Sequence, residues 1–177
     1  MITAPLLLLL IINNRPEVFK WLLAISFFSD AIDGCFARKY KVISKLGAKL
    51  DSIADDLTIV VAIIGMSVFK PGFLSQEAAL IIAVLVLFIL QTALAFLRYK
   101  KMSSFHTYGA KIAAILQGIF LLLLFFLDNP VYLLFYLTVA VTAIELVEEI
   151  IIVLLLPQWE INVKGLCWVI RKKQNNS

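Results

Sequence analysis

Residues 78–97 read AALIIAVLVLFILQTALAFL, a run of 20 residues without a charged side chain. A helix needs about 20 apolar residues to cross the hydrocarbon core of a bilayer, so this run is long enough for one membrane span. In the whole chain of 177 residues, 62% are hydrophobic and 16% are charged, whereas ordinary soluble domains carry roughly 25% charged residues. This composition excludes a disordered chain, a disulfide-stapled secreted domain and a soluble enzyme with one buried core.

Further apolar segments lie on both sides of this run. Four of them approach or reach the length of a span: residues 19–38, 46–69, 112–127 and 131–156. A backbone inside a bilayer must satisfy its own hydrogen bonds, which favours helices. The sequence therefore predicts an all-α, polytopic integral membrane protein with about six transmembrane helices, which form a single transmembrane domain over residues 1–177.

The first apolar segment, residues 2–12, is shorter than the others. Its 11 residues would cover only about 16 Å as a helix. A secretory signal would have a basic region before such a segment and a cleavage site of small residues after it, and the sequence has neither. We interpret the segment as a first span that lacks its beginning.

The basic residues predict the orientation of the spans. Thirteen of the 16 cations fall on one side of the predicted membrane: Arg38, Lys39, Lys41, Lys45, Lys49, Arg98, Lys100, Lys101, Lys111, Lys164, Arg171, Lys172 and Lys173. Arg15, Lys20 and Lys70 remain for the other side. The positive-inside rule places the richer side in the cytoplasm. The cations therefore follow the loops and give no indication of a nucleic-acid surface.

Four aspartates lie within the second and third predicted spans, towards their cytoplasmic ends. Asp30 and Asp33 are three residues apart, and Asp51 and Asp55 are four apart, so each pair shares one face of its helix. Charged residues in a span are costly and usually functional. Because four converging carboxylates would repel one another without a cation, and hard divalent ions prefer oxygen ligands, we expect Mg²⁺ or Mn²⁺ at this place.

Small residues and one arginine accompany the aspartates. Gly34 and Ala37 follow the first pair, and Gly47 precedes Asp51 by one turn. Small side chains allow a second helix or a ligand to approach closely. Arg38 adds a fixed cation, and a metal beside an arginine at the membrane surface is suited to binding phosphate.

In order, these residues are Asp30-x-x-Asp33-Gly34-x-x-Ala37-Arg38, then eight residues, then Gly47-x-x-x-Asp51-x-x-x-Asp55. This string resembles the signature of the CDP-alcohol phosphotransferase family, also called the CDP-alcohol phosphatidyltransferases, at all eight of its fixed positions. These are integral-membrane enzymes of phospholipid synthesis. The resemblance implies about six spans, with the motif across the second and third. It also implies a homodimer.

The resemblance implies a reaction in which a CDP-linked lipid, usually CDP-diacylglycerol, gives its phosphatidyl group to an alcohol and releases CMP. Asp30, Asp33 and Asp51 would bind divalent metal, with two ions expected. Asp55 would be a ligand of the second ion or the catalytic base. The CDP moiety would lie against a further set of residues: Gly34, Ala37, Arg38 and, as either a substrate contact or a helix-packing residue, Gly47.

The sequence departs from the family pattern at two places. Asp56 stands where many members have lysine, and a helix turns it about 100° away from Asp55. Family members usually begin with an amphipathic helix that lies at the membrane surface, whereas this chain begins within the first span.

Two groups of polar residues outside the motif have open interpretations. Glu145, Glu148 and Glu149 share a face of the last span, where they could shape the acceptor pocket or form an internal salt link to Lys111 or Arg98. The second group could hold the phosphate of an acceptor or contact anionic lipid headgroups, and consists of Arg98, Lys101, His106, Tyr108 and Lys111.

Two alternative functions remain at the level of the sequence. A related enzyme could use a CDP-linked small alcohol and a lipid acceptor. A small ion transporter could use the acidic cluster, but it would place that cluster near the midplane, with polar breaks towards both faces. The acceptor alcohol is not specified by the sequence.

Overall fold

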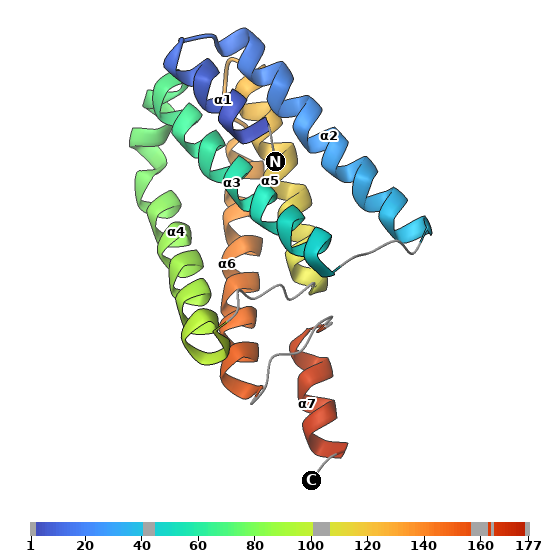
Figure 1. Ribbon diagram of the computed structural model, residues 1–177. Helices are drawn as coiled ribbons and strands as arrows, with labels where there is room; N and C mark the ends of the chain where they lie inside the picture. The colour runs from blue at the N-terminus through green and yellow to red at the C-terminus, as the bar shows by residue number, and fades with distance from the viewer. Residues whose placement is uncertain (1–2, 41–44, 101–106, 157–162, 164, 176–177) are drawn as a thin grey trace. The chain divides into compact units, whose positions relative to one another are not determined.

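The computed structural model describes residues 3–40, 45–100, 107–156, 163 and 165–175, and the side chains of residues 3–29, 32, 57–100, 107–156, 163 and 165–171. Within these ranges every regular element is an α-helix (Figure 1). The helices are α1 (Thr3–Ile12), α2 (Pro16–Tyr40), α3 (Lys45–Phe69), α4 (Pro71–Tyr99), α5 (Tyr108–Phe126), α6 (Tyr132–Leu155) and α7 (Leu166–Asn175).

The all-α prediction is confirmed, and each of the six predicted apolar segments falls on one helix. Among the described residues, α4 and α5 are the helices that are long and apolar enough to cross a membrane. Helix α1 and residues 57–69 of α3 are apolar but shorter, so six spans remain a prediction. The sequence analysis predicted no helix after the last span, where the structure has α7.

Local signals explain where several helices begin and end. Pro16 and Pro71 are the first residues of α2 and α4, where the missing proline N–H costs no helical hydrogen bond. Asn14 follows the end of α1 with a φ of +50°, a conformation that asparagine tolerates at helix ends. At α5, the Thr107 hydroxyl accepts a hydrogen bond from the N–H of Ala110 over 2.9 Å and caps the helix.

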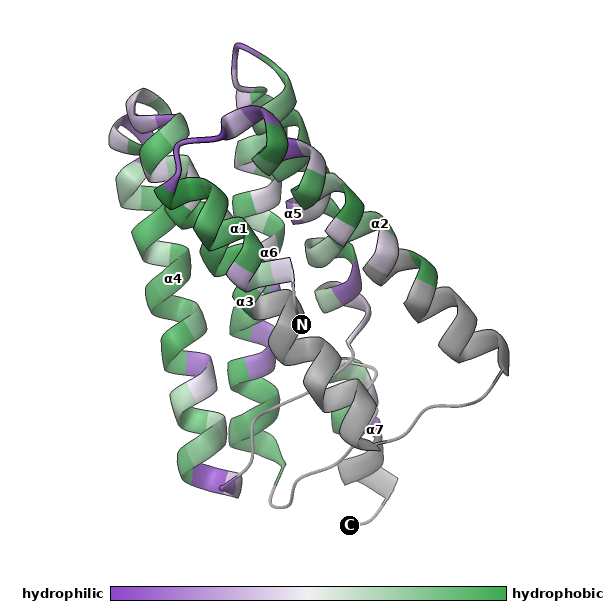
Figure 2. Ribbon diagram, turned by 45° about the horizontal axis from the view of Figure 1, so that its top comes forward, coloured by the Kyte–Doolittle hydropathy of each residue, from purple (hydrophilic) through white to green (hydrophobic). Residues whose placement is uncertain are grey.

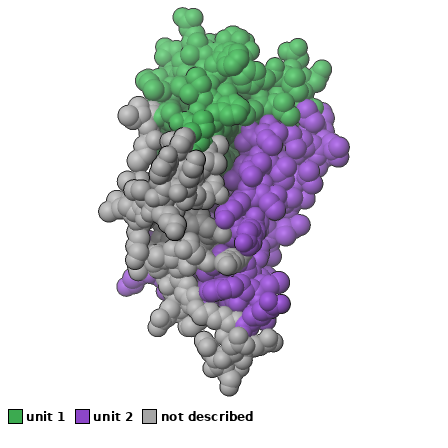
Figure 3. Space-filling view, turned by 90° about the vertical axis from the view of Figure 1, so that its right-hand side faces the viewer, with its two compact units in different colours: residues 1–76, 121–130 green, residues 77–120, 131–177 purple. Residues whose placement is uncertain are grey.

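The helices form two compact units, coloured separately in Figure 3, and each is described by itself. The first contains residues 1–76 and 121–130, and the second contains residues 77–120 and 131–177. The unit boundary therefore passes through α4 and α5.

In the first unit, α1 packs against both α2 and α3 (Figure 1). Phe19 of α2 is fully buried, and its ring centroid lies 5.3 Å from that of Phe69 and 5.0 Å from that of Phe125. Lys70 donates hydrogen bonds to the carbonyls of Leu127 and Asp128. These contacts join the C-terminal end of α3 to the end of α5.

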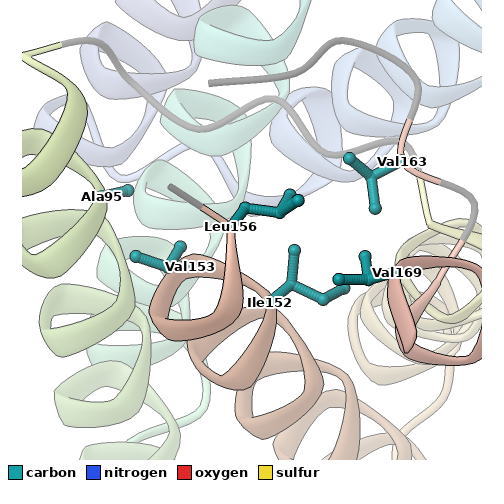
Figure 4. Close-up of a cluster of buried hydrophobic side chains, with 6 residues drawn as sticks. All are labelled: Ala95, Ile152, Val153, Leu156, Val163 and Val169. Carbon is teal, nitrogen blue, oxygen red and sulfur yellow. The ribbon is translucent and has the colours of Figure 1, made fainter. Parts of the chain in front are cut away.

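In the second unit, a buried apolar cluster joins α4, α6 and α7, and consists of Ala95, Ile152, Val153, Leu156, Val163 and Val169 (Figure 4). Large apolar side chains also point outward from the helices: Leu97 is 76% exposed and Leu133 is 83% exposed. Figure 2 shows hydrophobic residues over most of α4 and α6. Extensive exposed apolar surface is typical of helices that contact lipid.

Candidate active site

The aspartate motif lies on two unbroken helices. Asp30, Asp33, Gly34, Ala37 and Arg38 fall within α2, and the second half of the motif, Gly47, Asp51 and Asp55, falls within α3. Helical backbone across both halves supports the expected spacing, because residues three or four apart in a helix share one face.

The chain connectivity keeps the two halves of the motif near each other. Helix α2 ends at Tyr40 and α3 begins at Lys45. Five residue steps span at most about 18 Å even when fully extended. The two helices run in opposite directions from this connection (Figure 1), so the motif residues of both lie towards the same end of the pair.

The side chains of the motif lie outside the described residues. This applies to every predicted metal ligand and substrate contact, and to Asp56: Asp30, Asp33, Gly34, Ala37, Arg38, Gly47, Asp51, Asp55 and Asp56. Among the side chains that are described, no three His, Cys, Asp or Glu residues form a group that could hold a metal ion. The predicted roles of the motif residues therefore stay predictions.

At the opposite end of the motif helices, the ring of Phe19 in α2 lies against Gly65 of α3. A Cβ on Gly65 would lie 2.6 Å from the Phe19 Cζ, well inside van der Waals contact. Glycine thus lets the Phe19 ring lie directly on the backbone of α3. The Ser26 hydroxyl donates to the Thr3 hydroxyl over 3.2 Å, which ties α2 to α1. These contacts hold the helices that carry the aspartates.

The three glutamates of α6 have different partners. Glu145 and Glu149 are both 7% exposed and lie one turn apart on α6. Gln91 of α4 donates from Nε2 to Glu149 Oε2 over 2.6 Å. Glu148 Oε1 accepts a hydrogen bond from the backbone N–H of Leu166, at the start of α7, over 2.7 Å. Glu148 therefore acts as a helix cap.

A salt link to Lys111 or Arg98, one of the two interpretations of these glutamates, is absent among the described residues. The one ion pair among them joins Lys20 to Glu17. The Arg98 Nε donates instead to the Leu156 carbonyl over 3.2 Å, and the Lys111 Nζ lies 5.3 Å from the centre of the Tyr108 ring. The Leu156 carbonyl, at the end of α6, lacks a helical partner and therefore attracts the Arg98 cation. Lys101 and His106 lie outside the described residues.

Polar contacts that the sequence analysis missed link α4 and α5 to α6. Gln117 of α5 donates from Nε2 to the Thr142 hydroxyl over 2.9 Å, and the Tyr136 hydroxyl donates to Glu77 Oε1 over 2.9 Å. The sequence does indicate a polar face on α6, because polar residues recur at spacings of three and four within this apolar helix: Thr138, Thr142, Glu145 and Glu149. Polar side chains on one face of a span usually bond to a neighbouring helix.

The family model for the CDP-alcohol phosphatidyltransferases matches residues 1–155. This match includes the whole motif and all helices from α1 to α6. The chain belongs to the CDP-alcohol phosphatidyltransferase family. The family resemblance that the motif predicted is thereby confirmed.

One curated relative of this family member is the CDP-diacylglycerol–inositol 3-phosphatidyltransferase of Saccharomyces cerevisiae (strain ATCC 204508 / S288c). The two sequences are 47% identical over 45 residues, which is 25% of this chain and 20% of the yeast protein. The similarity thus spans about a fifth of the length of that relative. No solved structure matches the chain.

Proposed function

We propose that this phosphatidyltransferase transfers the phosphatidyl group of CDP-diacylglycerol to the hydroxyl of a small alcohol and releases CMP. The observation that carries the proposal is the complete string from Asp30 to Asp55 on two consecutive, unbroken helices. Four carboxylates, one arginine and three small residues are then available at one end of a helix pair. Their chemistry suits a pyrophosphate-containing substrate.

The donor set fits divalent metal. Asp30, Asp33, Asp51 and Asp55 offer only oxygen ligands, the type that Mg²⁺ and Mn²⁺ prefer. Helical backbone brings each pair to one face of its helix. Two bound ions would neutralise the pyrophosphate and act as Lewis acids towards the attacking and leaving oxygens.

The residues of the chain would divide the remaining work. Arg38 would bind a phosphate of the CDP moiety, and Gly34 and Ala37 would let that moiety approach the helix backbone. Asp55 would accept the proton of the acceptor hydroxyl as its oxygen attacks the phosphatidyl phosphorus. A new phosphorus–oxygen bond forms as the bond to CMP breaks, and CMP leaves with its electron pair.

Inositol is the first acceptor to test. The support is the similarity to the yeast enzyme whose name specifies inositol. That similarity covers a small part of both chains, so other alcohols belong in the same experiment. The active site is expected on the cytoplasmic side, because most cations of the chain gather at that end of the predicted spans.

A direct assay tests the proposal. Purified protein in detergent is given labelled CDP-diacylglycerol and one alcohol at a time, with inositol, glycerol phosphate, inositol phosphate and serine as the panel. CMP release that depends on one alcohol, together with the matching labelled phospholipid, would support the proposal. CMP release from a CDP-linked small alcohol and diacylglycerol, with none from CDP-diacylglycerol, would contradict it.

A further inference from the structure

Helix α7 has no role in the proposed transfer reaction. Its sequence, LCWVIRKKQN, contains three consecutive cations and no acidic residue. Val169 is buried in the apolar cluster of the second unit (Figure 4). Leu166 and Trp168 pack against that cluster. The hydrogen bond from Leu166 to Glu148 adds a polar tie at its first residue. The helix is therefore anchored to α6 along one side.

The other side of α7 is open. Cys167 and Arg171 are exposed and Ile170 is 45% exposed. These three positions lie within about 100° of one another on a helical wheel. The open face thus combines apolar groups with a cation. Arg171 makes no ion pair with any other described residue.

The surroundings of α7 are typical of the membrane–water boundary. Leu154, the next-to-last residue of α6, is 56% exposed. The Tyr99 hydroxyl donates to the carbonyls of Val153 and Leu156 at the same end of α6. Tyrosine and tryptophan with one apolar side and one polar tip are enriched at this boundary, and Trp168 adds a second such ring on α7.

We propose that α7 is an interfacial helix whose basic end binds the anionic headgroups of the bilayer. Charge complementarity selects this partner. The sequence of α7 carries three consecutive cations at 171–173 and no acidic residue. Several cations next to an apolar anchor are the pattern that anionic lipid headgroups attract at a membrane surface. Each cation near an anionic surface contributes about fivefold to binding, so three contribute on the order of 100-fold.

The exposed thiol of Cys167 allows a local test in the full-length chain. The protein is labelled with an environment-sensitive fluorophore and placed in nanodiscs of phosphatidylcholine, with or without phosphatidylserine. A Cys167→Ala sample gives the signal of any other labelled cysteine, which is subtracted. The measurement is the ratio of protected to exposed label, obtained with a neutral aqueous quencher.

Phosphatidylserine should raise this ratio on the order of 100-fold, and high salt should reverse the increase. The variant Arg171→Gln/Lys172→Gln/Lys173→Gln should lose the response. A matched control, Arg15→Gln/Lys20→Gln/Lys70→Gln, removes the same number of cations elsewhere and should keep it. If the first variant does not fold, the salt titration of the unaltered chain tests the proposal by itself: protection that high salt does not reverse would contradict it.

Three outcomes would overturn the proposal. Protection that is equal in both lipids would show that anionic headgroups are not the partner. Protection only in nanodiscs that hold two copies would indicate a contact between protein chains. Protection induced by added RNA and not by phosphatidylserine would indicate a nucleic-acid surface. Because the label reports on α7 alone, none of these results depends on the transferase assay.

Discussion

The side chain of Glu148 in α6 accepts a hydrogen bond from the backbone N–H of Leu166, the first residue of α7, over 2.7 Å. The second oxygen of the same carboxylate lies 3.3 Å from the place where a Cβ on Gly109 would stand, near the start of α5. One carboxylate therefore lies beside the N-terminal ends of two helices. Helix N-termini favour negative charge because their first N–H groups have no helical partner.

Replacing Glu148 should loosen α7. The change Glu148→Ala removes the cap, which typically costs about 1 kcal/mol. Amide exchange of the peptide covering residues 166–175 should become about fivefold faster, since that free energy opens the helix more often. Glu148→Gln keeps an oxygen acceptor and should have a smaller effect. Equal exchange in all three proteins would show that the hydrogen bond does not hold α7.

The contact between Gly65 and Phe19 makes a prediction for the motif helices. Gly65→Ala would place a methyl group 2.6 Å from the Phe19 Cζ, and the ring is fully buried and cannot easily move away. We expect a loss of about 1–3 kcal/mol, measured as a lower Tm in detergent. The added change Phe19→Leu should recover part of it.

Gly118 in α5 provides the matched control. A Cβ there would meet nothing within 4 Å, so Gly118→Ala should raise stability by about 0.5–1 kcal/mol through helix propensity alone. A similar Tm change for both alanine variants would refute the steric explanation for Gly65.

The carboxylate cluster predicts that turnover requires divalent metal. EDTA should abolish CMP release, and added Mg²⁺ or Mn²⁺ should restore it. Asp30→Asn and Asp51→Asn should remove turnover and keep the fold, because each change reduces repulsion among like charges. Thermal unfolding of the variants without metal checks the second point. Full activity in metal-free buffer, or loss of activity only through misfolding, would contradict the assignment.

An experiment can distinguish whether Asp55 acts as the catalytic base or as a metal ligand. It lies one turn farther along α3 than Asp51, and we favour the role of base. Asp55→Asn should then slow turnover by on the order of 10²- to 10⁴-fold with near-normal metal affinity. The measurement is a Mg²⁺ titration of turnover beside the unaltered enzyme. Substantial recovery at high Mg²⁺ would identify Asp55 as mainly a metal ligand.

The homodimer expected from the family resemblance is a separate prediction. Helix α4 exposes Ile82, Val86 and Ile89, spaced three and four residues apart, so one apolar face is available for a second copy. Lipid could cover the same face. Crosslinking and native mass measurement in mild detergent should show two copies, and only monomer across a concentration series would refute the prediction.

The sequence by itself determined the helices and the family. Uninterrupted apolar runs such as residues 78–97 can satisfy their backbone in a bilayer only as helices, so the positions of the predicted segments were confirmed. The motif from Asp30 to Asp55 was equally readable, because its spacing is local to two helices. Helix α7 was missed, since ten residues with three cations resemble a solvated tail unless their packing on α6 is known.

Only the tertiary structure decided which side chains meet. Sequence reasoning left the glutamates of α6 open between the acceptor pocket and a salt link to Lys111 or Arg98. In the structure, Glu149 bonds to Gln91 and Glu148 caps α7. The clearance that Gly65 gives to Phe19 was also invisible in the sequence. The physical reason is common to these cases. Periodicity shows which residues share a helix face, but the partner of that face depends on how helices distant in the chain pack against it.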